Sequence, residues 1–165
     1  MTNDPSQAGH GESETHGHSG RTEEFVTMTI DEQLFGIPVL MVQDVLRSQQ
    51  LRRVPLAPPE VAGALNLRGR IVTAIDVRKR LQLPERSDDS LGMSIVVDHD
   101  GELYSLIVDA VGEVLTLPAD LFEPSPATLN PVWKTISKGV YRLEDKLLLV
   151  VDVDRLLDFA AKVAA

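Results

Sequence analysis

Four aspartates stand at or near the ends of segments that are expected to be strands, and they are the residues best suited to acid–base chemistry. They are Asp76, Asp98, Asp109 and Asp152. Two carboxylates that lie close together with different pKa values can share general acid and general base work, so a small hydrolase that uses Asp76 and Asp109 is one hypothesis. Aspartates at strand ends more often accept hydrogen bonds from backbone amides in turns and helix caps. We therefore favour a structural role for all four and predict no catalytic residue.

Other reactive side chains are few. The sequence has no cysteine, which excludes thiol nucleophiles, disulfides and cysteine-ligated metals. His99 is the only histidine outside the first 22 residues, and it is expected to face solvent in a hairpin turn. Gly63 and Gly69 are not followed by the Lys-Ser/Thr pair of a phosphate-binding loop. No cofactor is therefore predicted.

The N-terminal segment offers a candidate metal tract. Residues 1–22 are rich in Ser, Gly, His, Glu and Thr and lack apolar periodicity, so we expect a disordered tail. His10, His16 and His18 lie in this tail and would suit the scavenging of a metal ion. Nothing in the sequence fixes a ligand geometry, so a solvated flexible tail is the favoured interpretation and no metal site is predicted.

The charge distribution argues against a nucleic-acid partner. The net charge is −9, although residues 47–86 hold nine bases against three acids, which favours an acidic partner for this segment. The stretch from Gly36 to Leu103 contains no Phe, Tyr or Trp to stack on bases, and the net charge has the wrong sign for nucleic acid. No apolar run is long enough to span a membrane, so we expect a soluble cytoplasmic protein without direct membrane insertion.

Period-two patterns and turn residues predict a mainly β fold. A hairpin is expected over 25–30 and 33–37, followed by a short helix from Pro38, because Val39, Val42 and Leu46 recur at helical spacing. Further strands are expected at 52–55, 70–77, 93–98, 102–109, 111–117, 136–143 and 146–153, with a basic helix over 78–81. A C-terminal helix is expected over about 154–163, with Asp152 or Asp154 as its cap.

The sequence also contains an internal repeat. The pattern Val39-x-x-Val42-x-Asp44-Val45-Leu46 recurs 69 residues later as Val108-x-x-Val111-x-Glu113-Val114-Leu115. Farther along, Ile75-Asp76-Val77 recurs at an offset of 76 as Val151-Asp152-Val153. Two similar units of about 60–70 residues, each made of short strands, are typical of a pair of small barrels.

Two features suit contact with another protein. Arg68 follows two leucines in an apolar loop, where an arginine is either ion-paired in the fold or presented to a partner; both alternatives stay open. The residues Val39, Val42, Val45 and Leu46 supply more apolar surface than one short helix needs. Core packing is the default for them, and an exposed valine would mark a docking groove.

Three motifs resemble the CheW family of bacterial chemotaxis coupling proteins. They are Phe35-Gly36-Ile37-Pro38-Val39-x-x-Val42-Gln43-Asp44-Val45, then Gly63-x-x-Asn66-Leu67-Arg68-Gly69, then Ile75-Asp76-Val77-Arg78. The resemblance covers residues 23–160 and implies two five-stranded SH3-like β-barrel subdomains with short helices and a C-terminal helix. It places barrel one over 23–84 and barrel two over 91–153, with an exchange of strands between them left open.

The resemblance also implies a non-enzymatic adaptor that couples methyl-accepting chemoreceptors to the chemotaxis histidine kinase in signalling arrays. Members of the family bridge the cytoplasmic tips of chemoreceptors and the regulatory domain of a CheA-type kinase, and the receptor tip docks between the barrels. By matching position, the receptor-binding candidates are Val42, Gly63, Asn66 and Arg68, and the kinase-binding candidates are Val39, Asp44 and Val45. The same module in a pilus-motility or second-messenger pathway stays an open alternative.

Overall fold

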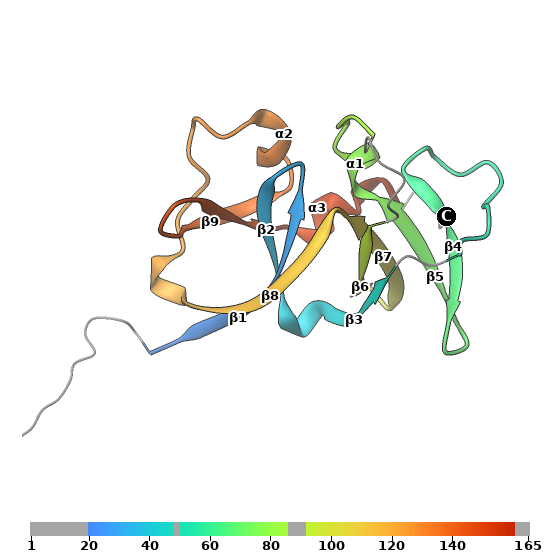
Figure 1. Cartoon of the computed structure of the whole chain (residues 1–165), viewed down its shortest axis with the longest axis horizontal. Helices are drawn as coiled ribbons and strands as arrows, with labels where there is room; N and C mark the ends of the chain where they lie inside the picture. The colour runs from blue at the N-terminus through green and yellow to red at the C-terminus, as the bar shows by residue number, and fades with distance from the viewer. Residues whose placement is uncertain (1–19, 48–49, 86–91, 161–165) are drawn as a thin grey trace, which may run out of the picture.

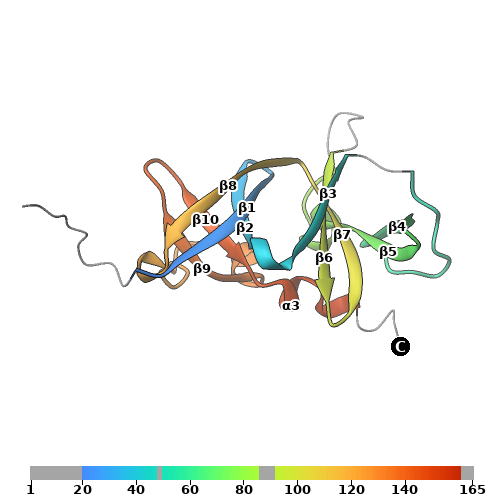
Figure 2. The same cartoon turned by 90° about the horizontal axis from the view of Figure 1, so that it is seen from below.

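The computed structural model describes residues 20–47, 50–85 and 92–160, and this part of the chain forms two five-stranded sheets that lie side by side (Figures 1 and 2). Sheet A has the order β8-β1-β2-β10-β9 and sheet B the order β3-β6-β7-β5-β4. The strands are β1 (Thr22–Ile30), β2 (Gln33–Pro38), β3 (Val42–Arg47), β4 (Val61–Leu67), β5 (Arg70–Asp76), β6 (Met93–His99), β7 (Glu102–Val108), β8 (Ala110–Pro118), β9 (Ser137–Arg142) and β10 (Leu147–Val151).

The helical elements are all short. They are η1 (Val39–Met41), α1 (Val77–Arg80), η2 (Ala119–Leu121), α2 (Pro131–Lys134), α3 (Val153–Leu156) and η3 (Asp158–Ala160). Asp76 and Asp152 cap α1 and α3, each accepting a hydrogen bond from a backbone amide of its helix. A mainly β fold with two five-stranded units and short helices is therefore confirmed.

Each sheet takes strands from both halves of the chain. Sheet A combines the β1–β2 hairpin with β8, β9 and β10, and sheet B combines the β6–β7 hairpin with β3, β4 and β5. The sequence repeat matches β1 with β6, β2 with β7, and so on to β5 with β10. When each strand is replaced by its counterpart, the order of sheet A becomes the order of sheet B. Neither half of the chain holds a complete sheet, so the two halves depend on each other to fold.

Each sheet curls until the chain leaving one edge strand reaches the other edge strand. After β3, the backbone of Arg52 exchanges two hydrogen bonds of 2.8 Å with Ala64 on β4. After β8, Glu123 makes the equivalent pair of hydrogen bonds with Val140 on β9. Among the described residues the edge strands themselves share no ladder, so each sheet is a partly open barrel whose two edges are joined at one isolated bridge.

Two glycines allow these closures. A Cβ atom on Gly63 would lie 2.7 Å from the carbonyl oxygen of Arg52 and 2.9 Å from Cβ of Leu51. A Cβ atom on Gly139, 76 residues later, would lie 2.5 Å from the carbonyl oxygen of Glu123. Because a Cβ atom would clash at either position, glycine at both positions allows the two backbones to approach closely.

Three groups of buried side chains hold the fold together. The largest group lies between the sheets and includes Phe35 and Trp133, whose rings meet edge to face with centroids 5.2 Å apart. Separate clusters fill the two barrels: Leu65, Val72, Ala74, Val96 and Leu103 in sheet B, and Phe25, Tyr141, Leu148 and Val150 in sheet A. The shared group makes the two sheets one folding unit.

The predicted helix from Pro38 is wrong. Only Val39–Met41 forms a single 3-10 turn, and the chain then continues as strand β3. Side chains along β3 alternate between half-buried and exposed, with Val42, Asp44 and Leu46 on the half-buried side. Antiparallel pairing with β6 therefore overrides the helical spacing of the valines.

Other differences from the expected elements are small. Residues 61–67 form β4, which was not expected as a strand, whereas the strand expected at 52–55 is reduced to the one bridge at Arg52. The C-terminal segment is the turn α3 followed by η3, and positions 161–163 of the expected helix lie outside the described residues. Among the described residues, no helix is long and apolar enough to cross a membrane.

Candidate partner-binding surface

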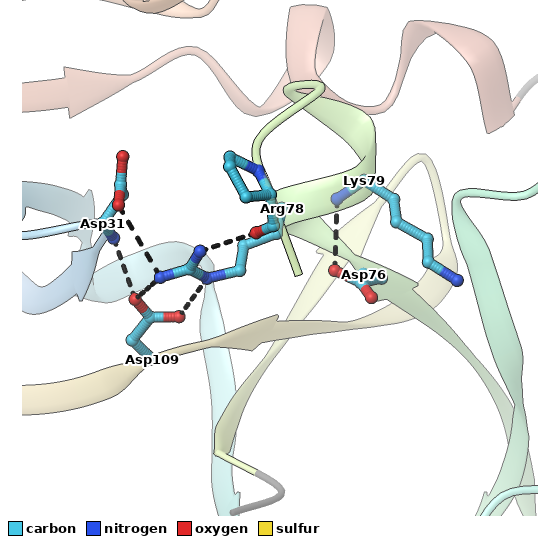
Figure 3. A network of polar contacts seen from close by, with 6 residues as sticks. Asp31, Asp76, Arg78, Lys79 and Asp109 are labelled. Atoms are coloured by element: carbon cyan, nitrogen blue, oxygen red, sulfur yellow. Dashed lines mark hydrogen bonds and ion pairs between the residues drawn. The ribbon is translucent and has the colours of Figure 1, made fainter. Parts of the chain in front are cut away.

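The strand-end aspartates all make structural contacts. Asp76 accepts a hydrogen bond from the Lys79 amide at 3.2 Å, and Asp98 accepts one from the Gly101 amide at 3.0 Å. Asp152 accepts from the Arg155 amide at 3.2 Å. Asp109 binds the guanidinium of Arg78 through both carboxylate oxygens (Figure 3). These contacts give the proposed hydrolase pair, Asp76 and Asp109, the roles of a helix cap and an ion-pair partner.

His99 does not project freely into solvent, contrary to expectation. Its side chain is 20% exposed, with Nδ1 lying 3.2 Å from Oδ1 of Asp154 at the start of α3. Its ring also meets that of Tyr104 edge to face at 6.1 Å. The part of the chain that the structure describes contains no group of three or more potential metal ligands. The histidines of the N-terminal tail, His10, His16 and His18, lie outside it.

Arg68 lies at the tip of the β4–β5 hairpin and is 74% exposed. Arg68 and Gly69 have φ values of +53° and +86°, as in the tight turns whose twist matches that of paired strands. The amide of Gly69 donates to Oδ1 of Asn66 at 2.9 Å, which stabilises this turn. The turn therefore projects the guanidinium outward and fixes its base.

A carboxylate holds the Arg68 side chain in place. Nη2 of Arg68 donates to Oδ2 of Asp44 at 2.7 Å, while Oδ1 of Asp44 accepts from the Val45 amide at 2.9 Å. Asp44 is 22% exposed and lies on β3, at the opposite edge of sheet B from β4. The ion pair therefore connects the β4–β5 turn with the strand at the opposite edge of sheet B. Arg68 is thus both ion-paired within the fold and exposed at the surface, the two roles that the sequence left open.

The valines of this region have different environments. Val42 is half-buried on β3 and packs against the core between the sheets, and Val39 packs there from η1. Val45 points to the other side of β3 and is 38% exposed. Gly63 is buried beneath the segment that includes Arg52, so it shapes this surface without presenting a side chain.

The receptor-side and kinase-side candidates therefore come together in sheet B. Val42, Asp44 and Val45 share strand β3, and Asn66 and Arg68 belong to the hairpin whose tip reaches that strand. We call the surface formed by Val42, Asp44, Val45, Asn66 and Arg68 the β3–hairpin surface. The expected division between two partners does not follow the two faces of β3, because Val42 and Asp44 lie on its half-buried side and only Val45 lies on its exposed side.

Sequence reasoning missed two exposed apolar side chains beside these candidates. Ile71 is 68% exposed and pairs with Asn66 across the β4–β5 hairpin. Leu40 is 95% exposed on η1, at the rim of a cavity of about 390 Å³ that is also lined by Val39, Glu23 and Glu24. Each of these apolar residues lies in or next to a turn, which could have marked it as exposed. The alternation of a strand does not by itself show which of its two faces is buried against the rest of the protein.

Comparisons with known proteins agree with this architecture. A family model described as "CheW-like domain" matches residues 24–161. The chemotaxis protein CheW of Klebsiella aerogenes is 30% identical over 135 residues, which cover 82% of this chain and 81% of the relative. CheW of Bacillus subtilis is 29% identical over 137 residues, covering 82% and 87%. The crystal structure of scaffolding protein TtCheW from Thermoanaerobacter tengcongensis superimposes with a TM-score of 0.72 at 27% identity, covering 79% of this chain and 89% of that one.

Proposed function

The chain belongs to the CheW-like domain family, and from this premise we propose that it couples methyl-accepting chemoreceptors to a CheA-type histidine kinase. Its relatives are chemotaxis proteins and its structural neighbour is a scaffolding protein, so the chain is a chemotaxis adaptor and not an enzyme. The site of action in this proposal is the cytoplasm, at membrane-associated receptor arrays. The partners are the cytoplasmic tips of chemoreceptors and the regulatory domain of the kinase.

The proposal rests mainly on Arg68, whose side chain is exposed and held in a defined position. The guanidinium at this hairpin tip is 74% exposed and offers several donors in a fixed planar arrangement, which suits an acidic or carbonyl-rich partner. Arginine is enriched in the residues that dominate protein interfaces. The ion pair with Asp44 orients this side chain before a partner arrives, so less conformational entropy is lost on binding.

In the proposed mechanism the β3–hairpin surface serves both partners. Val42, Asn66 and Arg68 contact the receptor tip, with Gly63 shaping the backbone beneath them. Val45 on the exposed side of β3, together with Val39 on η1 and Asp44 on the half-buried side of β3, contacts the kinase. Each contact needs on the order of 800 Å² of the adaptor's surface. Holding both partners on one rigid body raises their local concentration and lets receptor conformations bias the kinase through differential contacts.

Pairwise binding assays test this proposal. Immobilised chain would be titrated with a chemoreceptor tip fragment and, separately, with a kinase regulatory domain. We expect Arg68→Glu to weaken binding of the receptor fragment by at least about tenfold, because it reverses the charge at the centre of the contact. Val45→Asp should weaken binding of the kinase domain in the same way.

Sheet A supplies the matched control. Arg142 is 62% exposed and its Nε lies 3.0 Å from Oε1 of Glu123, so Arg142→Glu disrupts an equally superficial ion pair outside the β3–hairpin surface. This variant should bind both partners as the parent does. Equal binding by parent and Arg68→Glu, with circular dichroism unchanged, would contradict the proposed receptor contact.

A further inference from the structure

A half-buried ion-pair network joins the two sheets. Arg78 on α1 donates from Nε and Nη2 to the two oxygens of Asp109, at 2.8 and 2.6 Å (Figure 3). Its Nη1 donates to the carbonyl oxygen of Pro84 at 2.7 Å, and Nη2 lies 3.9 Å from Oδ1 of Asp31. The amide of Asp31 in turn donates to Oδ2 of Asp109 at 2.8 Å. We call these residues the Arg78 network.

The members of the Arg78 network come from both sheets. Arg78 follows β5 of sheet B, and Asp31 lies in the turn between β1 and β2 of sheet A. Asp109 is the residue at which the chain passes from β7 of sheet B to β8 of sheet A. Any rotation of one sheet against the other must therefore stretch or break these contacts.

The geometry of the Arg78 network fixes the relative orientation of its side chains. The side chains of Arg78 and Asp109 are only 17% and 18% exposed, and the hydrogen bonds to Asp109 raise the pKa of the Arg78 guanidinium. Two parallel charge-assisted hydrogen bonds fix the planes of both groups. The apolar core between the sheets resists their separation, but burial of apolar area alone does not set an angle.

The equivalent position in the repeat lacks such a network. Asp154 on α3 stands where Arg78 stands on α1, at the 76-residue offset, and its side chain is 82% exposed. Leu40, 95% exposed, stands where Asp109 stands, at the 69-residue offset. This side has instead two contacts of His99 with exposed carboxylates: Nδ1 lies 3.2 Å from Oδ1 of Asp154, and Nε2 lies 3.6 Å from Oδ2 of Asp100, which stands where Asp31 stands at the 69-residue offset. The molecule is thus firmly tied on one side of its internal repeat and loosely on the other.

We propose that Arg78 is a positioning residue whose network sets the orientation of sheet A relative to sheet B. Arg80 on the same helix also reaches α3, donating to the carbonyl oxygens of Leu156 and Arg155, both at 2.8 Å. That contact also joins the two sheets, because α1 follows β5 of sheet B and α3 follows β10 of sheet A, but it ends on backbone carbonyls and lacks the paired ionic hydrogen bonds of the Arg78 network. Loss of the network gives the sheets a wider range of orientations, and the side of His99 and Leu40 is where they separate.

Distance measurement between the sheets tests this role directly. Because the chain has no cysteine, Ala62→Cys on β4 and Lys138→Cys on β9 place two spin labels at exposed, equivalent positions of the sheets. Pulsed electron paramagnetic resonance on the full chain then reports the distribution of distances between them. Removing the charge by Arg78→Gln should shift or broaden this distribution by roughly 1–2 Å, the scale of shifts at packed interfaces. Arg78→Lys keeps the charge without the fork geometry and should give a smaller change.

Asp154→Asn is the matched control, since it alters the equivalent residue of the repeat, and it should reproduce the parent distribution. Thermal melting of every variant separates orientation from stability. A parent-like distribution in Arg78→Gln and Arg78→Lys, even with a lower melting temperature, would overturn the proposal. If Arg78→Gln does not fold, Arg78→Lys alone decides the question. The measurement needs no partner, so its result stands apart from the proposed coupling of receptor and kinase.

Discussion

Asp44 on β3 and Arg68 in the turn after β4 belong to opposite edges of sheet B, yet their side chains meet at 2.7 Å. The contact joins the two ends of a curled sheet at the protein surface. It also joins a residue expected to face the kinase with one expected to face the receptor. Since Arg68 is 74% exposed, solvent screens the pair, and its main effect is on the geometry of the surface.

Breaking this ion pair should change binding more than stability. Asp44→Asn is expected to lower the free energy of unfolding by less than about 1 kcal/mol, because exposed ion pairs contribute little. Binding of the receptor fragment should weaken severalfold, since Arg68 loses its orientation. Urea denaturation and titration of the same preparation give the two values. A loss of several kcal/mol with parent-like affinity would assign the pair a purely structural role.

Replacing the glycine at either barrel closure by alanine should lower the free energy of unfolding by a similar amount. Gly63→Ala and Gly139→Ala each place a Cβ atom against a backbone carbonyl, so each should cost about 1–3 kcal/mol of unfolding free energy. Gly69→Ala is the control, because a Cβ atom there meets nothing within 4 Å and only the positive φ of +86° opposes it. Urea midpoints should rank Gly69→Ala above the other two. A parent-like midpoint for either closure variant would mean that the backbones separate easily.

The exchange of strands predicts a single cooperative unfolding transition. Trp133, the only tryptophan, lies in the core shared by the sheets, so its fluorescence should follow the same curve as the far-ultraviolet circular dichroism. Leu148→Ala in the sheet A barrel and Leu103→Ala in the sheet B barrel should each lower the free energy of unfolding of that single transition by about 2–5 kcal/mol. Two separate transitions in either variant would show that the sheets fold independently.

Alkaline pH should destabilise the fold through Tyr104. Burial, assisted by a hydrogen bond from the hydroxyl to Glu102 at 3.0 Å, raises the pKa of Tyr104 to about 12. The folded state therefore prefers the neutral phenol, and this contribution is complete below pH 10 and lost as the pH rises toward 12. It amounts to something on the order of 2 kcal/mol.

Tyr104→Phe isolates this effect. The variant loses the hydrogen bond to Glu102 at every pH, but the part of the stability loss between pH 10 and 12 that comes from Tyr104 should disappear. Urea midpoints of the parent and the variant at pH 9 and pH 11 are the relevant measurement. Parallel changes in the two proteins would show that the pKa of Tyr104 is the same in the folded and unfolded states.

Local patterns predicted the elements whose partners are adjacent in sequence. The β1–β2 and β6–β7 hairpins follow from period-two alternation and from turn residues such as Asp31 and Gly101. β3 was mistaken for a helix because Val39, Val42 and Leu46 recur at helical spacing after Pro38, whereas the pairing with β6 that makes it a strand joins residues far apart in the sequence. β4 was missed because Ala62, Gly63 and Ala64 have low strand propensity and are small to admit the segment at Arg52.

The sequence identified individual residues of the candidate site but did not show that they lie together on one surface. Arg68 and Val45 were identified from the family motif, whereas their proximity depends on the curl of sheet B and the turn geometry at Gly69. The Arg78 network was not foreseen, because Asp31, Arg78 and Asp109 come together only through strand exchange between the sheets. Interactions that depend on the placement of distant strands leave no local signal in a single sequence.

The central claim is that one molecule of this chain holds a receptor and a kinase together. A chemoreceptor tip fragment on a resin would be mixed with the kinase regulatory domain in the presence and absence of the chain. The account predicts that the kinase domain is retained only when the chain is present, and that Arg68→Glu abolishes this retention while Arg142→Glu preserves it. Equal retention of the kinase domain without the chain, or binding of only one partner at a time, would contradict the account.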